Sequence, residues 1–83
     1  MPAINVCFPS NPLSSRNVDP DYVEDANAFA QIGAGILTWS MDEPHLKTRE
    51  ARGFTWHEGA PVVWRGWMLD SEHYRLWSQS LGM

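Results

Sequence analysis

The sequence predicts a small α/β domain: a three-stranded parallel sheet of strand order 2-1-3 with two helices. Three short apolar runs, Ala3–Phe8, Ile36–Trp39 and Pro61–Arg65, alternate with two segments that begin with helix-capping residues. Such alternation favours a parallel sheet covered by helices. Right-handed crossovers then put the second and third strands on opposite sides of the first. With 83 residues, the chain is expected to form one domain, residues 1–83, with a small core.

The first predicted strand, Ala3–Phe8, has the large apolar side chains Ile4, Val6 and Phe8 at alternate positions, which is the pattern of a strand. Pro9 and Pro12 are expected to end it, because a proline cannot continue a central ladder. A polar loop is expected from there to Asn17.

The first helix is expected to start at Asp19, a good N-cap, with Pro20 in the first helical position. Apolar residues then recur at helical spacing and predict one buried face: Tyr22, Ala26, Phe29 and Ala30. Gly33 or Gly35 is expected to end this helix.

The second strand, Ile36–Trp39, leads into a polar segment of mixed charge, Asp42–Gly59, which predicts an irregular excursion with a helical turn near Leu46–Ala51. After the third strand, Asp70 is expected to cap a second helix that ends at Gly82.

Composition argues against several classes of protein. The net charge of −4 disfavours a general nucleic-acid binder. The longest uncharged run, Ala26–Met41, is too short and too polar to cross a membrane, and no basic region precedes an apolar stretch at the N-terminus. The single cysteine, Cys7, fits a reducing compartment. We therefore expect a cytoplasmic protein without a membrane or nucleic-acid partner.

The predicted strand order also indicates where a ligand would bind. Ligands of open α/β sheets lie outside the carboxyl ends of the strands at the switch point, here between the first and third strands. The segments Pro9–Arg16 and Arg65–Met68 are expected to meet there. The candidate substrate- or partner-binding residues are Ser10, Asn11, Arg16, Arg65, Gly66 and Trp67.

Each of these candidates also has a structural interpretation. Arg65 offers a planar fork for a carboxylate or phosphate, but it can equally pair with an acidic residue of the first helix, with Gly66 as a bulge. Ser10, Asn11 and Arg16 can bind a small anion, or the two polar residues can serve ordinary turn chemistry. Both interpretations stay open at this point.

No catalytic or metal-binding constellation stands out in the sequence. There is no glycine-rich phosphate loop of either common type. The three histidines are spread over three segments, and His57-Glu58 is no zinc signature. Cys7 is expected to be a small buried hydrophobe. We expect no catalytic residue, no metal and no cofactor in this chain.

Five tryptophans are unusual for a chain of this length. They can enlarge a small core, or some of them can form an interface or line a pocket. A thin core and exposed sheet edges also favour self-association, so we expect a homo-oligomer or docking onto the remainder of a longer protein.

Two stretches resemble the N-terminal, pre-ATP-grasp domain of ATP-grasp proteins from bacteria and phages. The element Trp64-Arg65-Gly66-Trp67-Met68-Leu69, followed by a capped helix with Tyr74 four residues past its cap, is the more specific one. Phe8–Leu13 and the helix entry at Val18-Asp19 also resemble that region. The resemblance covers most of the chain and is weakest over Asp42–Gly59.

This resemblance implies a pre-ATP-grasp-like α/β half domain without activity of its own, which contributes to the acceptor-substrate side of an ATP-grasp ligase-like protein. ATP and magnesium would enter only with a following ATP-grasp lobe, and the whole protein would be an ATP-dependent carboxylate–amine ligase. The alternative is a stand-alone, phage-related interaction protein that binds a protein partner or itself through exposed tryptophans.

Overall fold

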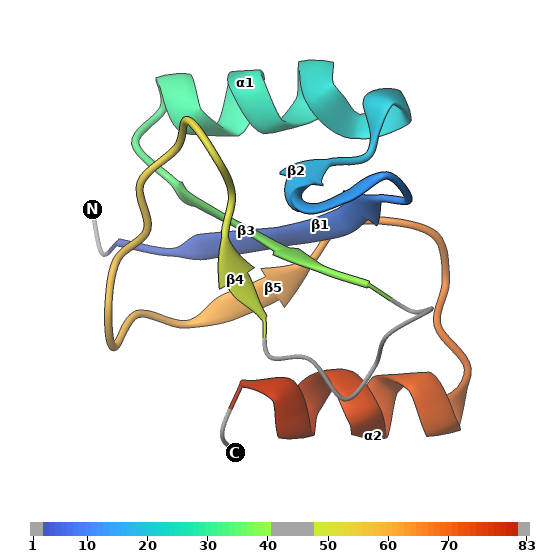
Figure 1. Cartoon of the computed structure of the whole chain (residues 1–83). Coiled ribbons are helices and arrows are strands. Elements are labelled where there is room, and N and C mark those ends of the chain that lie inside the picture. Colours follow the sequence, from blue (N-terminus) through green and yellow to red (C-terminus); the bar gives the residue numbers. More distant parts are fainter. Residues whose placement is uncertain (1–2, 41–47, 82–83) are drawn as a thin grey trace.

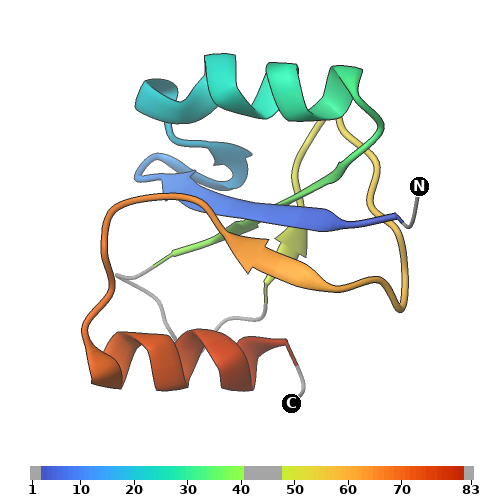
Figure 2. The ribbon, with the colours of Figure 1, turned by 180° about the vertical axis from the view of Figure 1, so that it is seen from behind.

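The computed structural model describes residues 3–40 and 48–81. A curled sheet forms the middle layer, and the helices α1 (Val23–Gln31) and α2 (Ser71–Ser80) cover its opposite faces (Figure 1, Figure 2). The α/β class with two helices is therefore confirmed.

The sheet is mixed and has five strands among the described residues: β1 (Asn5–Asn11), β2 (Ser14–Val18), β3 (Gly35–Trp39), β4 (Arg49–Glu50) and β5 (Val62–Trp64). The central strand β1 runs parallel to β3 and to β5. Two antiparallel strands are added, because β2 folds back on β1 and β4 pairs with β3. The prediction of a three-stranded, wholly parallel sheet is therefore wrong. Its three parallel strands do have the predicted arrangement, because β1 lies between β3 and β5.

The hairpin of β1 and β2 explains much of this difference. Pro9 does not end β1, which continues to Asn11 and keeps its register with β3 at Trp39. Proline has no N–H for the next ladder bond, so pairing with β5 stops after the bond from the Arg65 N–H to the Cys7 carbonyl. The Pro9 carbonyl instead accepts from the Asp19 N–H at 2.8 Å, and β2 takes over this edge of β1.

Two hydrophobic clusters fill the space between the layers. Val6 and Phe8 point from β1 toward α1, where Ala26 is fully buried and Phe29 packs against them. Cys7 points to the other face, toward Trp77 of α2. This alternation is the two-residue period of a strand with both faces buried.

The capping predictions hold at both helices. Asp19 caps a short 3₁₀ turn, η1 (Pro20–Tyr22), that leads into α1, and Asp70 caps α2. Gly33, with φ of +92°, follows the end of α1, whereas Gly35 belongs to β3.

Two other predicted boundaries concern the segment after β3 and the end of α2. A helical turn near Leu46–Ala51 is not formed where the structure describes that stretch, because Arg49–Glu50 pairs with β3 as β4. The first two residues of the stretch, and Gly82 at the expected end of the second helix, lie outside the described residues.

Candidate functional site

A cavity of about 330 Å³ opens at the carboxyl end of the parallel strands. We call it the carboxyl-edge cavity, and its lining residues are Pro9, Ser10, Pro12, Asp19, Trp39, Ser40 and Trp67. They come from the end of β1, the cap of η1, the end of β3 and the loop after β5. Parallel strands bring these segments to one edge, which is where open α/β sheets bind ligands.

Trp39 forms a buried wall of this cavity. Its side chain is 1% exposed, and its ring meets that of Trp64 edge to face, with 5.9 Å between the ring centroids. The indole Nε1 of Trp39 is buried and has no hydrogen-bond partner within residues 3–40 and 48–81. An unsatisfied buried donor costs about 1–3 kcal/mol, so this buried N–H lowers the stability of the fold by about that amount.

Trp67 and Asp19 line more open parts of the cavity. Trp67 is 42% exposed, and its ring contacts Tyr22 with 5.9 Å between centroids. Its carbonyl accepts from the Trp64 indole N–H at 2.9 Å, which fixes the loop after β5. Asp19 brings a carboxylate, one oxygen of which accepts from the Asp21 N–H. Lysine and arginine are absent from the described lining, so its formal charge is negative.

Of the predicted site residues, Ser10 and Trp67 meet in this cavity. Gly66 lies behind it: a Cβ there would come within 2.7 Å of Pro9 Cγ and 3.0 Å of the Trp64 ring. Glycine at this position therefore allows the loop after β5 to pack closely on β1.

Arg65 points away from the cavity. Its Nη2 lies 3.6 Å from Asp25 Oδ2 of α1, and its guanidinium carbon lies 6.0 Å from the centre of the Phe29 ring. This is the pairing with the first helix that the sequence left open. The Arg65 side chain remains 58% exposed.

Asn11 and Arg16 also lie outside the lining. The Asn11 side chain accepts from the Leu13 N–H at 2.8 Å and so makes the turn between β1 and β2. Arg16 is exposed on β2, where its carbonyl accepts from the Arg52 N–H.

Five lining residues were not among the predicted site residues: Pro9, Pro12, Asp19, Trp39 and Ser40. Pro9 and Pro12 lie within the segment Pro9–Arg16 that was expected at this edge, whereas the other three lie outside both expected segments. Trp39 and Ser40 directly follow the second predicted strand, so the switch-point argument would have found them had it been applied to that strand's end. Asp19 was interpreted as a helix cap alone, and it serves as a cap and as a wall of the cavity.

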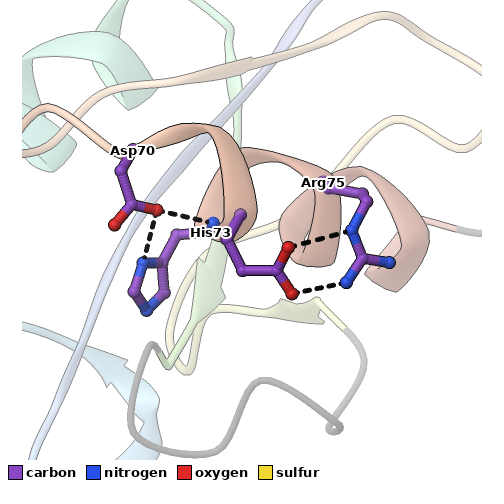
Figure 3. Close-up of polar contacts among 4 residues, drawn as sticks. Asp70, His73 and Arg75 are labelled. Carbon is purple, nitrogen blue, oxygen red and sulfur yellow. Dashed lines mark hydrogen bonds and ion pairs between the residues drawn. The ribbon is translucent and has the colours of Figure 1, made fainter.

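The start of α2 carries a polar cluster with a capping role (Figure 3). Asp70 Oδ1 accepts from the His73 N–H at 2.9 Å and from the His73 ring nitrogen at 2.8 Å. The backbone bond from His73 is the main cause that lowers the pKa of Asp70. Arg75 donates to Glu72 from two nitrogens, and this hydrogen bonding lowers the pKa of Glu72. The polar groups of Asp70, Glu72, His73 and Arg75 therefore bond to one another and stabilise α2 itself.

Cys7 is buried between β1 and α2, where its sulfur accepts from the Trp77 indole N–H at 3.4 Å. Burial raises the pKa of the thiol to about 12, although the bond from Trp77 acts in the opposite direction. A thiol held protonated in this way is a poor nucleophile.

Within residues 3–40 and 48–81, no three histidine, cysteine or acidic side chains come close enough to hold a metal ion. His57, one of the two residues weighed as a metal pair, contacts the Gly33 carbonyl through its ring at 2.8 Å. No helix in the described part of the chain has the length and apolar character needed to cross a membrane. Comparison of the chain with models of protein families, with curated proteins and with solved structures found no match.

Proposed function

We propose that this chain is a non-catalytic, substrate-side binding domain of the kind that precedes the nucleotide-binding lobes of ATP-grasp proteins. One observation supports this most. The two stretches that resemble that family, Phe8–Leu13 and Trp64–Leu69, are far apart in the sequence but pack on each other, through the contact of Gly66 with Pro9 and the bond from Arg65 to Cys7. Both stretches line the carboxyl-edge cavity.

In this proposal the cavity forms part of the acceptor-substrate side of a ligase-like protein. Ser10 and Trp67 are its substrate- or partner-binding residues, and Gly66 positions Trp67. ATP and magnesium belong to a following lobe, as the absence of a phosphate loop in the sequence suggests. We also propose a cytoplasmic location, because the one cysteine is a free thiol.

The sequence of the DNA that follows codon 83 in the source genome tests this proposal. The proposal requires a reading frame that continues into an ATP-grasp lobe. A stop codon after Met83 would overturn it and leave the alternative, a stand-alone interaction protein. Trp56 and Trp67 are each 42% exposed, and such exposed tryptophan side chains favour that alternative.

A second test concerns the chain itself. We predict no measurable affinity for magnesium-ATP, because the chain has neither a glycine loop for phosphates nor an acidic metal cluster beside basic residues. Isothermal titration calorimetry measures this directly. A dissociation constant below about 10 μM, equivalent to a binding free energy of about −7 kcal/mol, would contradict the prediction.

A further inference from the structure

We propose that a hollow beside the end of α2 binds a small organic cation, a primary ammonium group on an apolar body. This assignment goes beyond the proposed function, because the hollow shares no described lining residue with the carboxyl-edge cavity and needs no ATP-grasp lobe. It rests on the shape of the hollow, on the hydrogen bonds that its polar side chains can still make and on its charge.

The hollow has a volume of about 800 Å³, within the range of roughly 300–1,000 Å³ that is typical of small-molecule sites. The loop before β5 crosses the sheet at Gly35, where a Cβ would lie 2.7 Å from the Trp56 Cα atom. Figure 1 and Figure 2 both show this loop and the end of α2 on the same side of the molecule. The hollow opens between the two, with Leu37 and Val62 on its sheet side and Leu81 on its helix side.

The polar side chains of the hollow can accept hydrogen bonds but have few protons left to donate. The Ser80 hydroxyl donates its single proton to the Trp77 carbonyl at 2.5 Å. The 2.6 Å contact between Thr48 Oγ1 and Ser80 Oγ therefore has Thr48 as its donor. Both hydroxyls, like the Glu50 carboxylate, can then only accept from a ligand. The other N–H or O–H among the described lining side chains is that of Trp56, which is 42% exposed and open to water. A ligand with several N–H donors fits this set.

The charge of the hollow selects a cation. Glu50 is the one charged side chain among the described lining residues, and no ion pair between described residues includes it. It lies across from Leu37 in the β3–β4 pairing and shares its face, whereas Arg49 lies on the opposite face. Lys47 lies outside the described residues. The last turn of α2 has no basic residue, and its carbonyl end adds partial negative charge. A cation is complementary to these groups, and an anion is repelled.

The apolar part of the hollow selects the body of the cation. Leu37 is buried in the cluster around Trp77, and Val62 and Leu81 pack against that cluster. The exposed ring of Trp56 adds an aromatic wall, and an indole face attracts a cation. A hydrated metal ion gains nothing from these walls, whereas an ammonium ion with an aromatic or aliphatic body uses both parts of the hollow.

The experiment is a titration of the ¹⁵N-labelled full chain, followed by NMR, with four probes: phenethylammonium, phenethyl-trimethylammonium, hydrocinnamyl alcohol and hydrocinnamate. We expect phenethylammonium to shift the indole N–H signal of Trp56 and to leave that of Trp67 in place. It should bind at least about tenfold more tightly than the alcohol and the carboxylate, with an affinity that falls as salt is added. The trimethylated cation has no N–H to donate and should bind severalfold more weakly than the primary ammonium.

Matched variants locate the site, each after its melting curve has shown that it folds. Glu50→Gln should lower the affinity for phenethylammonium to about that for the alcohol, whereas Glu24→Gln, the same change at an exposed position on α1, should not. Trp56→Ala should weaken binding severalfold, and Trp67→Ala, an equally exposed residue at the other cavity, should leave it unchanged. Thr48→Val removes an acceptor at nearly constant volume and should reduce the advantage of the primary over the trimethylated ammonium.

The proposal fails if phenethylammonium does not bind or binds no better than the alcohol. It also fails if Glu50→Gln and Glu24→Gln lose affinity equally. Pairing at the edge of β5 extends the sheet sideways and leaves its α2 face open, so the affinity should not depend on protein concentration. An affinity that falls as the protein concentration rises would make a second copy of this chain the occupant. None of these outcomes depends on the reading frame after codon 83, so this proposal and the ATP-grasp proposal can fail separately.

Discussion

At the scale of single residues, Asn5 holds the loop between β4 and β5 with its side chain. Its side chain is fully buried, donates to the His57 carbonyl and accepts from the His57 N–H, both at 2.8 Å. The amide thus imitates a peptide group and attaches the loop before β5 to the start of β1. Gly35 leaves the space for it, because a Cβ there would lie 2.1 Å from the Asn5 side-chain oxygen.

We predict that Asn5→Asp destabilises the fold strongly at neutral pH and less at acidic pH. The carboxylate keeps the acceptor for the His57 N–H but faces the His57 carbonyl without a proton to donate, and burial raises its pKa. Its stabilising, protonated form is present at low pH and is lost as the pH rises through that pKa. Denaturant unfolding at pH 4 and pH 7 measures the difference. Asn27→Asp, on the exposed face of α1, is the control, and equal pH dependence in the two variants would contradict the prediction.

Cys7 gives a second prediction at this scale, at alkaline pH. Burial raises the pKa of its thiol from 9.0 to about 12, so between these values the folded chain keeps a proton that the unfolded chain has lost. The free energy of unfolding should therefore fall by up to about 1.4 kcal/mol per pH unit from this thiol. Unfolding at pH 8, 9 and 10 tests this against Cys7→Ala, which should lack this part of the decline. Parallel pH curves for the two proteins would contradict the prediction, because they would show that the thiol has the same pKa in the folded and the unfolded chain.

At the scale of elements, the loop between β5 and α2 combines two residues with different roles. Gly66 packs on Pro9 with no space for a side chain, whereas Arg65 reaches an exposed partner on α1. We predict that Arg65→Ala changes the free energy of unfolding by no more than about 1 kcal/mol, because exposed ion pairs contribute little. In a domain of this size that corresponds to a Tm shift of no more than about 4–8 °C.

Gly66→Ala is the contrasting variant and should lower Tm further, since its Cβ collides with the Pro9 ring. Melting curves of both variants, each with a binding assay, test the assignment. A collapse of Tm in Arg65→Ala would make Arg65 a structural residue. An unchanged Tm with lost binding would instead assign Arg65 to the working surface despite its pairing with Asp25.

The local elements were predictable because their signals are local. Capping by Asp19 and Asp70 and the alternation around Val6 predict both helices and the central strand. The hairpin was not predictable in this way, because Ser14–Val18 is polar and becomes a strand only through pairing with β1 across the bulge near Ser10. Strand β4 is similar, because its two residues are exposed and form a strand only through antiparallel pairing with β3.

The site was predictable in part for the same reason. Strand order indicates the edge at which a ligand binds, and Ser10 and Trp67 lie there. The direction of a long side chain depends on tertiary partners, and Arg65 finds Asp25 and Phe29 on α1. The indole N–H of Trp39 is buried without a hydrogen-bond partner within the described residues. This depends on the groups that surround it in the fold, and no sequence pattern encodes them.

At the scale of the whole molecule, the tryptophans divide between core and surface. Trp39, Trp64 and Trp77 form a continuous edge-to-face series, with 5.9 Å between successive ring centroids, and this series joins the end of β3 to α2. Trp56 and Trp67 are exposed at opposite ends of the sheet. Trp39, Trp64 and Trp77 therefore enlarge the core, and Trp39 also lines the carboxyl-edge cavity together with Trp67. A role of the exposed tryptophans in an interface stays a prediction.

The exposed apolar surface leads to the last prediction, self-association. Strand β5 pairs with β1 alone among the described strands, and Val63 on it is 49% exposed. A hollow of about 800 Å³ beside it is lined by Trp56, Pro61, Val62 and Leu81, among others. An open strand edge invites pairing with another chain, and a small core gains stability from association.

We therefore predict a homodimer or larger assembly at micromolar concentration. Val63→Lys should shift it toward monomer, whereas Ile32→Lys, which is exposed beyond the end of α1, should not. Analytical ultracentrifugation measures both, and a well-folded monomer at about 0.1 mM would show that the β5 edge does not pair at such concentrations.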